Sequence, residues 1–148
     1  MFIRDLGTTG AMPALEMTLR FAGQRQKILS HNIANIDTPE FQPRDVDPRG
    51  FQELLGDAVR SRRARTGGAF GELEWRQTRQ IRRTHERGGI ALRPKTPGPG
   101  VLHHDRNNTD IERMMQSVVE NAATYRVASD LLRSQRTQLQ NAIGQRVL

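Results

Sequence analysis

The chain has 148 residues, no cysteine and a formal net charge of +7, and 35% of its residues are hydrophobic. This length fits one domain, and the lack of cysteine excludes disulfide frameworks, thiolate zinc sites and cysteine nucleophiles. No stretch approaches the roughly 18 apolar residues of a membrane-spanning helix, and residues 1–7 lack the apolar core of a cleaved secretory signal. We therefore expect the chain to stay in the cytoplasm or to leave the cell by a route that needs no cleaved signal.

Residues 1–36 are predicted to hold an N-terminal helix. Its seam positions alternate between spacings of four and three residues, as in a coiled coil, with Gln26 as the polar interruption. Pro13 fits the first turn, and Pro39 ends the helix because the residue before a proline avoids the helical conformation. The seam consists of Leu15, Leu19, Ala22, Gln26, Leu29, Ile33 and Ile36.

Residues 37–60 are predicted to hold a turn and a short amphipathic helix. Five apolar side chains recur there at helical spacing and so share one face. This helix can fold back on the first one or dock on a neighbouring molecule. The five residues are Phe51, Leu54, Leu55, Ala58 and Val59.

Residues 61–106 carry the whole net charge of the chain. Ten arginines and one lysine stand there against four acidic residues, and seven of the 13 glycines lie in the same segment. Glycine and proline at this density are turn and breaker signals. The few large apolar side chains bury too little surface to offset the entropy lost on ordering the segment. We expect a poorly structured basic insertion, flexible or ordered by partners.

Residues 107–148 are predicted to form a second long helix. Thr109-Asp110-Ile111-Glu112 is a capping box, and no glycine or proline follows until Gly144. This length exceeds the roughly 8–20 residues of most globular helices and favours coiled-coil packing. The seam consists of Ile111, Met115, Val118, Ala122, Tyr125, Ser129, Leu132, Arg136, Leu139 and Ile143.

These elements predict an all-α fold in which the two long helices form an antiparallel coiled-coil hairpin. The short helix and the basic insertion lie between them in the chain. A single pair of helices leaves one side of the wide C-terminal stripe uncovered. Either the chain is a simple intramolecular hairpin or the stripes are completed by other subunits, and the width favours the second arrangement.

No motif for catalysis or cofactor binding is present in the sequence. His103-His104-Asp105 lacks a third ligand at helical spacing, so it does not predict a metal site. Glu72 and Glu74 lie in the segment expected to be poorly structured, whereas acid–base catalysis needs a rigid frame. We expect no enzymatic activity, no cofactor, no metal and no small-molecule substrate.

The arginine-rich middle segment leaves a second function open. Arginines neutralise phosphates, and aromatic residues such as Phe70 and Trp75 stack on unpaired bases. The arginines lie on no clear single face, however, and no known nucleic-acid-binding module is visible. A basic nucleic-acid-binding protein is therefore the alternative to an assembly protein.

The break after the first helix carries a recognisable string of residues. It resembles SxNIANxxTPGY, the N-terminal signature of the flagellar axial proteins that build the rod and the hook. Glu40 replaces the usual glycine and so disfavours a left-handed backbone there, and Phe41 replaces the usual tyrosine. The signature positions are Ser30, Asn32, Ile33, Ala34, Asn35, Thr38, Pro39 and Phe41.

Other short stretches make the resemblance most specific for the small proteins of the proximal rod. The resemblance spans roughly residues 10–60 and 105–148. The stretches are Arg25-Gln26, Arg44-Asp45-Val46-Asp47, Asn107-Asn108-Thr109-Asp110, Asn121-Ala122 and Tyr125-Arg126.

The resemblance implies a structural protein of the basal body rod. It implies assembly with other copies of the chain, with the proximal rod proteins FlgC and FliE, and with the MS-ring and the flagellar export gate. It also implies export through the flagellar type III apparatus, without a cleaved signal, to the rod in the periplasmic space. The terminal helices are then expected to form the inner coiled-coil layer of the drive shaft.

The resemblance also implies roles for individual residues. The signature residues are expected to shape the turn and the contacts between subunits. A second set is expected to hold the helix pair and its neighbours together. That set consists of Leu15, Leu19, Leu29, Ile33, Ile36, Ile111, Val118, Tyr125, Leu132, Leu139 and Ile143.

Overall fold

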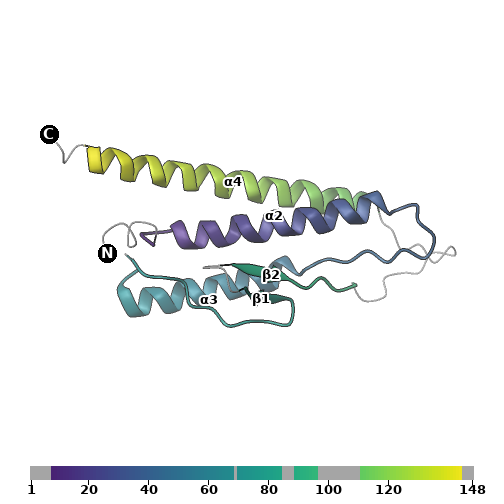
Figure 1. Ribbon diagram of the computed structural model, residues 1–148, viewed down its shortest axis with the longest axis horizontal. Helices are drawn as coiled ribbons and strands as arrows, with labels where there is room; N and C mark the ends of the chain where they lie inside the picture. The colour runs from purple at the N-terminus through teal and green to yellow at the C-terminus, as the bar shows by residue number, and fades with distance from the viewer. Residues whose placement is uncertain (1–7, 69, 85–88, 97–110, 145–148) are drawn as a thin grey trace.

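The computed structural model describes residues 8–68, 70–84, 89–96 and 111–144 (Figure 1). These residues form three helices and one two-stranded antiparallel sheet. The expected helices are present at both ends of the chain, whereas the middle contains a small sheet that the all-α prediction lacks. In chain order, the elements are α2 (Met12–Ala34), α3 (Pro48–Thr66), β1 (Ile81–Arg83), β2 (Ile90–Leu92) and α4 (Ile111–Gly144).

α2 is the central element of the molecule. In Figure 1, α4 runs along one side of α2, and α3 and the sheet lie on the other side. α2 and α4 run in opposite directions, because Glu16 contacts Arg136 whereas Ala22, further along α2, contacts the earlier Asn121. The expected packing of the two long helices against each other is confirmed.

The apolar core lies between α2, α3 and the sheet rather than between the two long helices. The rings of Phe21 and Phe51 stack there, with centroids 3.9 Å apart and planes 6° from parallel. Among the described residues, α4 contributes nothing to this cluster. The buried core residues are Met17, Phe21, Val46, Phe51, Leu54, Ile81 and Ile90.

Part of the segment 61–106 is ordered on this core, which corrects the expectation of a poorly structured insertion. α3 continues to Thr66 and ends at Gly67, which has the left-handed φ of 66°. Ile81 and Ile90 are then buried against α2 and α3. The apolar side chains inside the segment bury too little surface among themselves, but α2 and α3 supply further apolar surface for them to cover. The candidate ligands His103, His104 and Asp105 lie outside the described residues.

Side chains close both edges of the sheet. On β2, the Gln24 Nε2 donates to the Ile90 carbonyl O at 2.6 Å, and its Oε1 accepts from the Leu92 N–H at 3.2 Å. On β1, the Ile81 N–H donates to Thr78 Oγ1 at 3.0 Å, and the Thr78 N–H donates to the Ile81 carbonyl O at 2.9 Å. An open edge recruits further strands, so this closed sheet is unsuited to adding a strand from a partner.

Arg62 fastens the chain before α2 to the end of α3. Its guanidinium donates to the carbonyl oxygens of Thr8 and Gly10, each at 2.6 Å. The side chain is buried, and burial lowers the pKa of Arg62 from its ordinary value. Backbone carbonyls thus replace the water that this cation loses on folding.

Candidate assembly interface

Arg25 and Asp45 form an ion pair near the middle of α2. Arg25 Nε donates to Asp45 Oδ1 at 2.9 Å, and Arg25 Nη2 donates to Asp45 Oδ2 at 2.6 Å. Arg25 is only 6% exposed. Two parallel bonds between a guanidinium and a carboxylate fix orientation as well as distance. The pair therefore holds the chain that returns from the turn in one position against α2.

Asp45 also organises the backbone around it. Its Oδ1 accepts from the Val46 N–H at 2.7 Å, and its own N–H and carbonyl O bond to the backbone of Lys95, both at 2.9 Å. Two residues later, Asp47 caps α3 by accepting from the Arg49 N–H at 2.9 Å. Residues 45–47 consequently join α2, α3 and the segment that follows β2.

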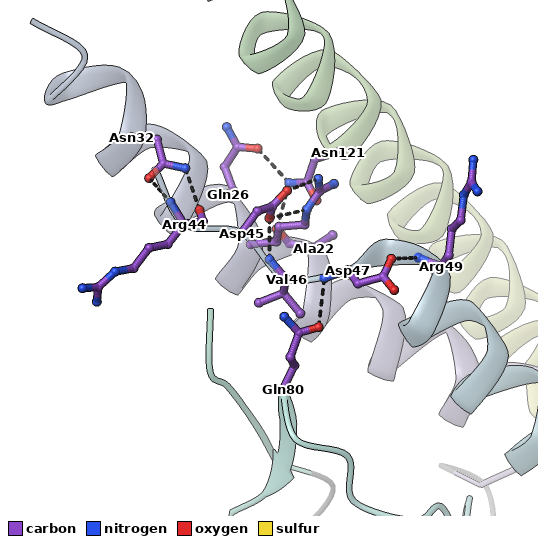
Figure 2. A network of polar contacts seen from close by, with 11 residues as sticks. Ala22, Gln26, Asn32, Arg44, Asp45, Val46, Asp47, Arg49, Gln80 and Asn121 are labelled. Carbon is purple, nitrogen blue, oxygen red and sulfur yellow. Dashed lines mark hydrogen bonds and ion pairs between the residues drawn. The ribbon is translucent and has the colours of Figure 1, made fainter. Parts of the chain in front are cut away.

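Asn32 holds the same stretch from the end of α2. Its Nδ2 donates to the Arg44 carbonyl O at 2.6 Å, and its Oδ1 accepts from the Arg44 N–H at 3.1 Å (Figure 2). The side-chain amide of Asn32 thus pairs with the backbone N–H and carbonyl O of Arg44 as a neighbouring strand does. The two polar groups of Asn32 and the two of Arg44 all have hydrogen-bond partners. This signature asparagine is buried and positions the return of the chain.

Asn121 connects α4 to α2 (Figure 2). Its Nδ2 donates to the Ala22 carbonyl O at 2.9 Å and to Gln26 Oε1 at 2.8 Å. The small side chain of Ala22, which is fully buried, lets the amide reach the α2 backbone. Gln26, the polar residue that interrupts the predicted apolar seam, therefore forms a hydrogen bond between the two helices.

The turn after α2 has a left-handed residue at Glu40, with φ 61°. The Phe41 N–H donates to the Thr38 carbonyl O at 3.1 Å, so Pro39 and Glu40 occupy the two central positions of a β-turn. Proline followed by a residue with positive φ is the arrangement of a type II turn. Glutamate in place of glycine was expected to disfavour a left-handed backbone here. That prediction is wrong, because the hydrogen bond and Pro39 impose the left-handed conformation despite the Glu40 side chain.

The same turn is supported by contacts with the last turn of α2. Asn35 Nδ2 donates to the His31 carbonyl O at 2.7 Å. The rings of His31 and Phe41 meet edge to face, with centroids 5.9 Å apart. Among the signature residues, Asn32 is buried and Ile33, Asn35 and Phe41 are partly buried. The exposed members are Ser30, Ala34, Thr38 and Pro39.

α4 contacts the rest of the chain through a narrow face and leaves large apolar side chains exposed. Its buried residues are Asn121, Ala128 and Leu132, so the inner face is mostly small or polar. Ile111, Met115 and Val119 follow one another at four-residue spacing and form an outer stripe. Val127 and Leu131, also four residues apart, form a second exposed apolar pair on the helix. The exposed large apolar residues of α4 are Ile111, Met115, Val119, Tyr125, Val127, Leu131 and Ile143.

The residues predicted to pack the helices fall into three groups in the single chain. Leu29 and Leu132 are buried. Tyr125 is 48% exposed, but its Cε2 lies 3.8 Å from the position of a Cβ on Gly23. Ile111 and Ile143 are 54% and 49% exposed. The partly buried members are Leu15, Leu19, Ile33, Ile36, Val118 and Leu139.

Comparison with known proteins identifies the family of the chain. No family model matches it. The flagellar basal body rod protein FlgB of Yersinia enterocolitica is 32% identical over 127 residues, which are 85% of this chain and 88% of the relative. The chain belongs to the FlgB family. FlgB of Salmonella typhimurium is 30% identical over 132 residues, covering 84% and 86% of the two chains. FlgB of Bacillus subtilis is 27% identical over 117 residues, covering 79% and 80%.

Membership of the FlgB family gives the chain a structural role in the flagellar basal body rod. The FlgB relatives are structural components and not enzymes. These similarities give no support to the nucleic-acid alternative. In residues 8–68 and 111–144, no helix has the combination of length and hydropathy that crossing a membrane requires.

The sequence alone assigns no role to Arg25, Asp45 or Asn121, although each lies in a stretch that resembles the FlgB family. The sequence nevertheless contains a signal for the Arg25–Asp45 pair. Arg25 lies four residues after Phe21 and three before Ile28, with apolar neighbours on the same helix face. A charge on such a face requires a buried partner. Asn121 lacks a comparable signal, because Ala122 beside it fits the heptad pattern better.

Proposed function

We propose that this chain is a subunit of the proximal rod and that it polymerises through its two long helices. The observation that carries this proposal is the apolar surface of α4. Val119 is 66% exposed and Leu131 is 50% exposed in the single chain. They lie on different sides of α4, since twelve residues separate them and a helix turns by about 100° per residue. One partner helix cannot cover both sides, so assembly requires more than one neighbour.

The unequal lengths of the helices also support assembly. α4 has 34 residues and α2 has 23. At about 1.5 Å per residue, α4 is about 16 Å longer than its partner. The C-terminal end of α4 extends beyond the start of α2 (Figure 1), and Ile143 is half exposed there. In the proposed rod, this free end packs against a neighbouring subunit in the inner coiled-coil layer.

The finer assignments rest on the resemblance to rod proteins. The exposed signature residues Thr38 and Pro39 make contacts between subunits in the proposed rod. The proposed partners are further copies of the chain, FlgC, FliE, the MS-ring and the export gate. The proposed route is the flagellar type III apparatus, which delivers the chain without a cleaved signal to the rod in the periplasmic space.

The test places a charge on the exposed apolar surface of α4. Val119→Asp and Leu131→Asp are compared with Ser134→Asp, which adds the same charge at an exposed polar position. Purified Val119→Asp and Leu131→Asp keep the urea midpoint of the unchanged chain, because neither site lies in the folded core. Cells that carry either variant lose motility, and their basal bodies lack the protein, whereas Ser134→Asp cells swim. Motile cells with normal amounts of both variants in the rod contradict the proposal.

A second experiment locates the unchanged protein. Basal bodies are purified through a high-salt wash and analysed by peptide mass spectrometry. The wash is needed because a chain of net charge +7 adheres to anionic surfaces. Peptides retained in proportion to other rod proteins support the proposal, and their absence beside normal amounts of those proteins rejects it.

A further inference from the structure

The outward face of the β1–β2 sheet carries positive charges that form no ion pair with an acidic residue in the described part of the chain. The register places Arg82 opposite Ala91. Arg93 lies two residues beyond Ala91, so it is the diagonal neighbour of Arg82 on the same face. The alternate residues Ile81 and Ile90 point into the core. Two guanidinium groups are therefore held on one side of a two-stranded sheet.

A cleft of about 280 Å³ lies beside the start of β1, where Gln80 and Ile81 line it. Arg79 and Lys95 line it, together with Thr78 and Gln80. We define the basic face as Arg79, Arg82, Arg93 and Lys95, all of which are exposed. None of the ion pairs within the described residues involves these four side chains. Residues 76–84 and 89–96 contain six basic residues and no acidic one.

The backbone beneath the basic face is firmly held. Gln24 bonds to β2, and Lys95 pairs with the backbone of Asp45. The Arg93 N–H donates to the Gln80 carbonyl O at 2.8 Å. Like charges close together on a sheet destabilise it. A bound anion removes that repulsion, and a fixed backbone lowers the entropy cost of binding it.

We propose that the basic face binds a carboxylate-rich surface of a protein other than this chain. A guanidinium presents a planar fork of donors that matches a carboxylate. Cationic and polar side chains line the cleft, and they suit a few protruding acidic side chains. Asp47 lines the same cleft, so the incoming carboxylate lies toward Arg79 and Lys95. The β1–β2 sheet is on the opposite side of α2 from α4 (Figure 1), and the proposal is independent of assembly through α4.

Among the described residues, two groups of acidic side chains are poorly placed to complement the basic face in a second copy. Four acidic residues, including the partly buried Asp45, are already in ion pairs within the chain. On α4, Glu112, Glu120 and Asp130 are spread along the helix among arginines. Neither group therefore gives a second copy a compact set of carboxylates that matches four cations, and this favours a different protein as the partner.

The first test measures binding of fluorescent poly-L-glutamate to the purified full chain. A triple variant of the basic face, Arg79→Gln, Arg82→Gln and Arg93→Gln, is compared with Arg49→Gln, Arg126→Gln and Arg133→Gln. Both remove three exposed positive charges. We expect the first variant to weaken binding by about tenfold or more and the second by about twofold. Equal losses show that only total charge matters and overturn the proposal.

The second test identifies the partner in cells. A photoreactive phenylalanine derivative replaces Thr84, which shares the outward face, or Gln52, an exposed control on α3. We expect Thr84 to cross-link to an acidic peptide of another protein and Gln52 not to do so. A cross-link to a second copy, to nucleic acid or to lipid, or none at all, overturns the proposal. Val119→Asp keeps poly-L-glutamate binding, so this proposal and the assembly proposal fail separately.

Discussion

Arg25 of α2 and Asp45 of the returning chain are joined by two parallel hydrogen bonds, 2.9 and 2.6 Å long, across 20 residues of sequence. The side chain of Arg25 is 7% exposed and that of Asp45 is 27% exposed. Water therefore replaces the lost partner poorly when either side chain is removed. We therefore expect the Arg25–Asp45 pair to contribute to the free energy of unfolding.

Asp45→Ala is expected to lower the free energy of unfolding by about 2–4 kcal/mol, because it leaves the Arg25 guanidinium buried without its counter-charge. Urea denaturation followed by circular dichroism measures the change. Asp57→Ala is the control, since it removes an exposed ion pair with Arg60 and is expected to cost less than about 1 kcal/mol. Similar losses in the two variants contradict a structural role for the Arg25–Asp45 pair.

Asn121→Ala is expected to loosen α4 from α2, because two hydrogen bonds worth about 1–3 kcal/mol together are lost. The chain has no cysteine, so cysteines introduced at Glu16 and Arg136 report this contact through a short bismaleimide cross-linker. We expect less cross-linking in Asn121→Ala. Gln116→Ala, which removes an exposed amide from α4, leaves the yield unchanged. An unchanged yield in Asn121→Ala means that other contacts fix the helices.

Glu40→Gly is expected to stabilise the fold by up to about 1 kcal/mol. A side chain in the left-handed region costs about 1–2 kcal/mol, and the greater freedom of glycine in the unfolded chain cancels part of the gain. Thermal unfolding measures this effect as a higher Tm. Glu40→Ala keeps the strained backbone and removes the same charge, so it shows no comparable rise. If alanine and glycine raise the Tm equally, the effect comes from charge instead.

Gln24→Leu is expected to release β2 from α2, because the amide that closes the strand edge is lost. Trypsin then cleaves after Arg82 and Arg83 about tenfold faster, since local opening of the sheet becomes easier. Gln52→Leu on the exposed side of α3 is the matched control and keeps the wild-type cleavage rate. Peptide mapping of the products checks both the sites and the rates. Protection that persists in Gln24→Leu shows that the core alone holds the sheet.

The helices could be predicted because their signals are local. The apolar spacing of residues 111–144 depends on neighbours a few positions away. The stop expected at Pro39 is less accurate, because α2 already ends at Ala34 with Asn35 as its C-cap. α3 was also predictable from its one apolar face. It continues beyond the predicted end at residue 60 to Thr66, because the arginine-rich residues 60–65 contain no strong helix-stop signal before Gly67. The candidate assembly residues followed from the same local patterns and from the signature string.

The order of the middle segment was not predictable in the same way. Ile81 and Ile90 are two apolar residues among many charges, and they are buried only because α2 and α3 supply a complementary surface. The conformation of Glu40 likewise depends on the hydrogen bond between Thr38 and Phe41 and not on the preference of glutamate. In both places, long-range or turn contacts outweigh local propensity.

The amino-acid sequence was enough to predict the long helices, the surplus of positive charge and the resemblance to rod proteins, because periodicity, composition and short motifs are properties of the chain. The packing of the elements sets where the core lies, which polar residues meet, and which apolar side chains of α4 remain exposed. Arg25 meets Asp45, and Asn121 meets Gln26, across 20 and 95 residues. Partners so far apart are chosen by how the elements pack, since no local rule of spacing links them.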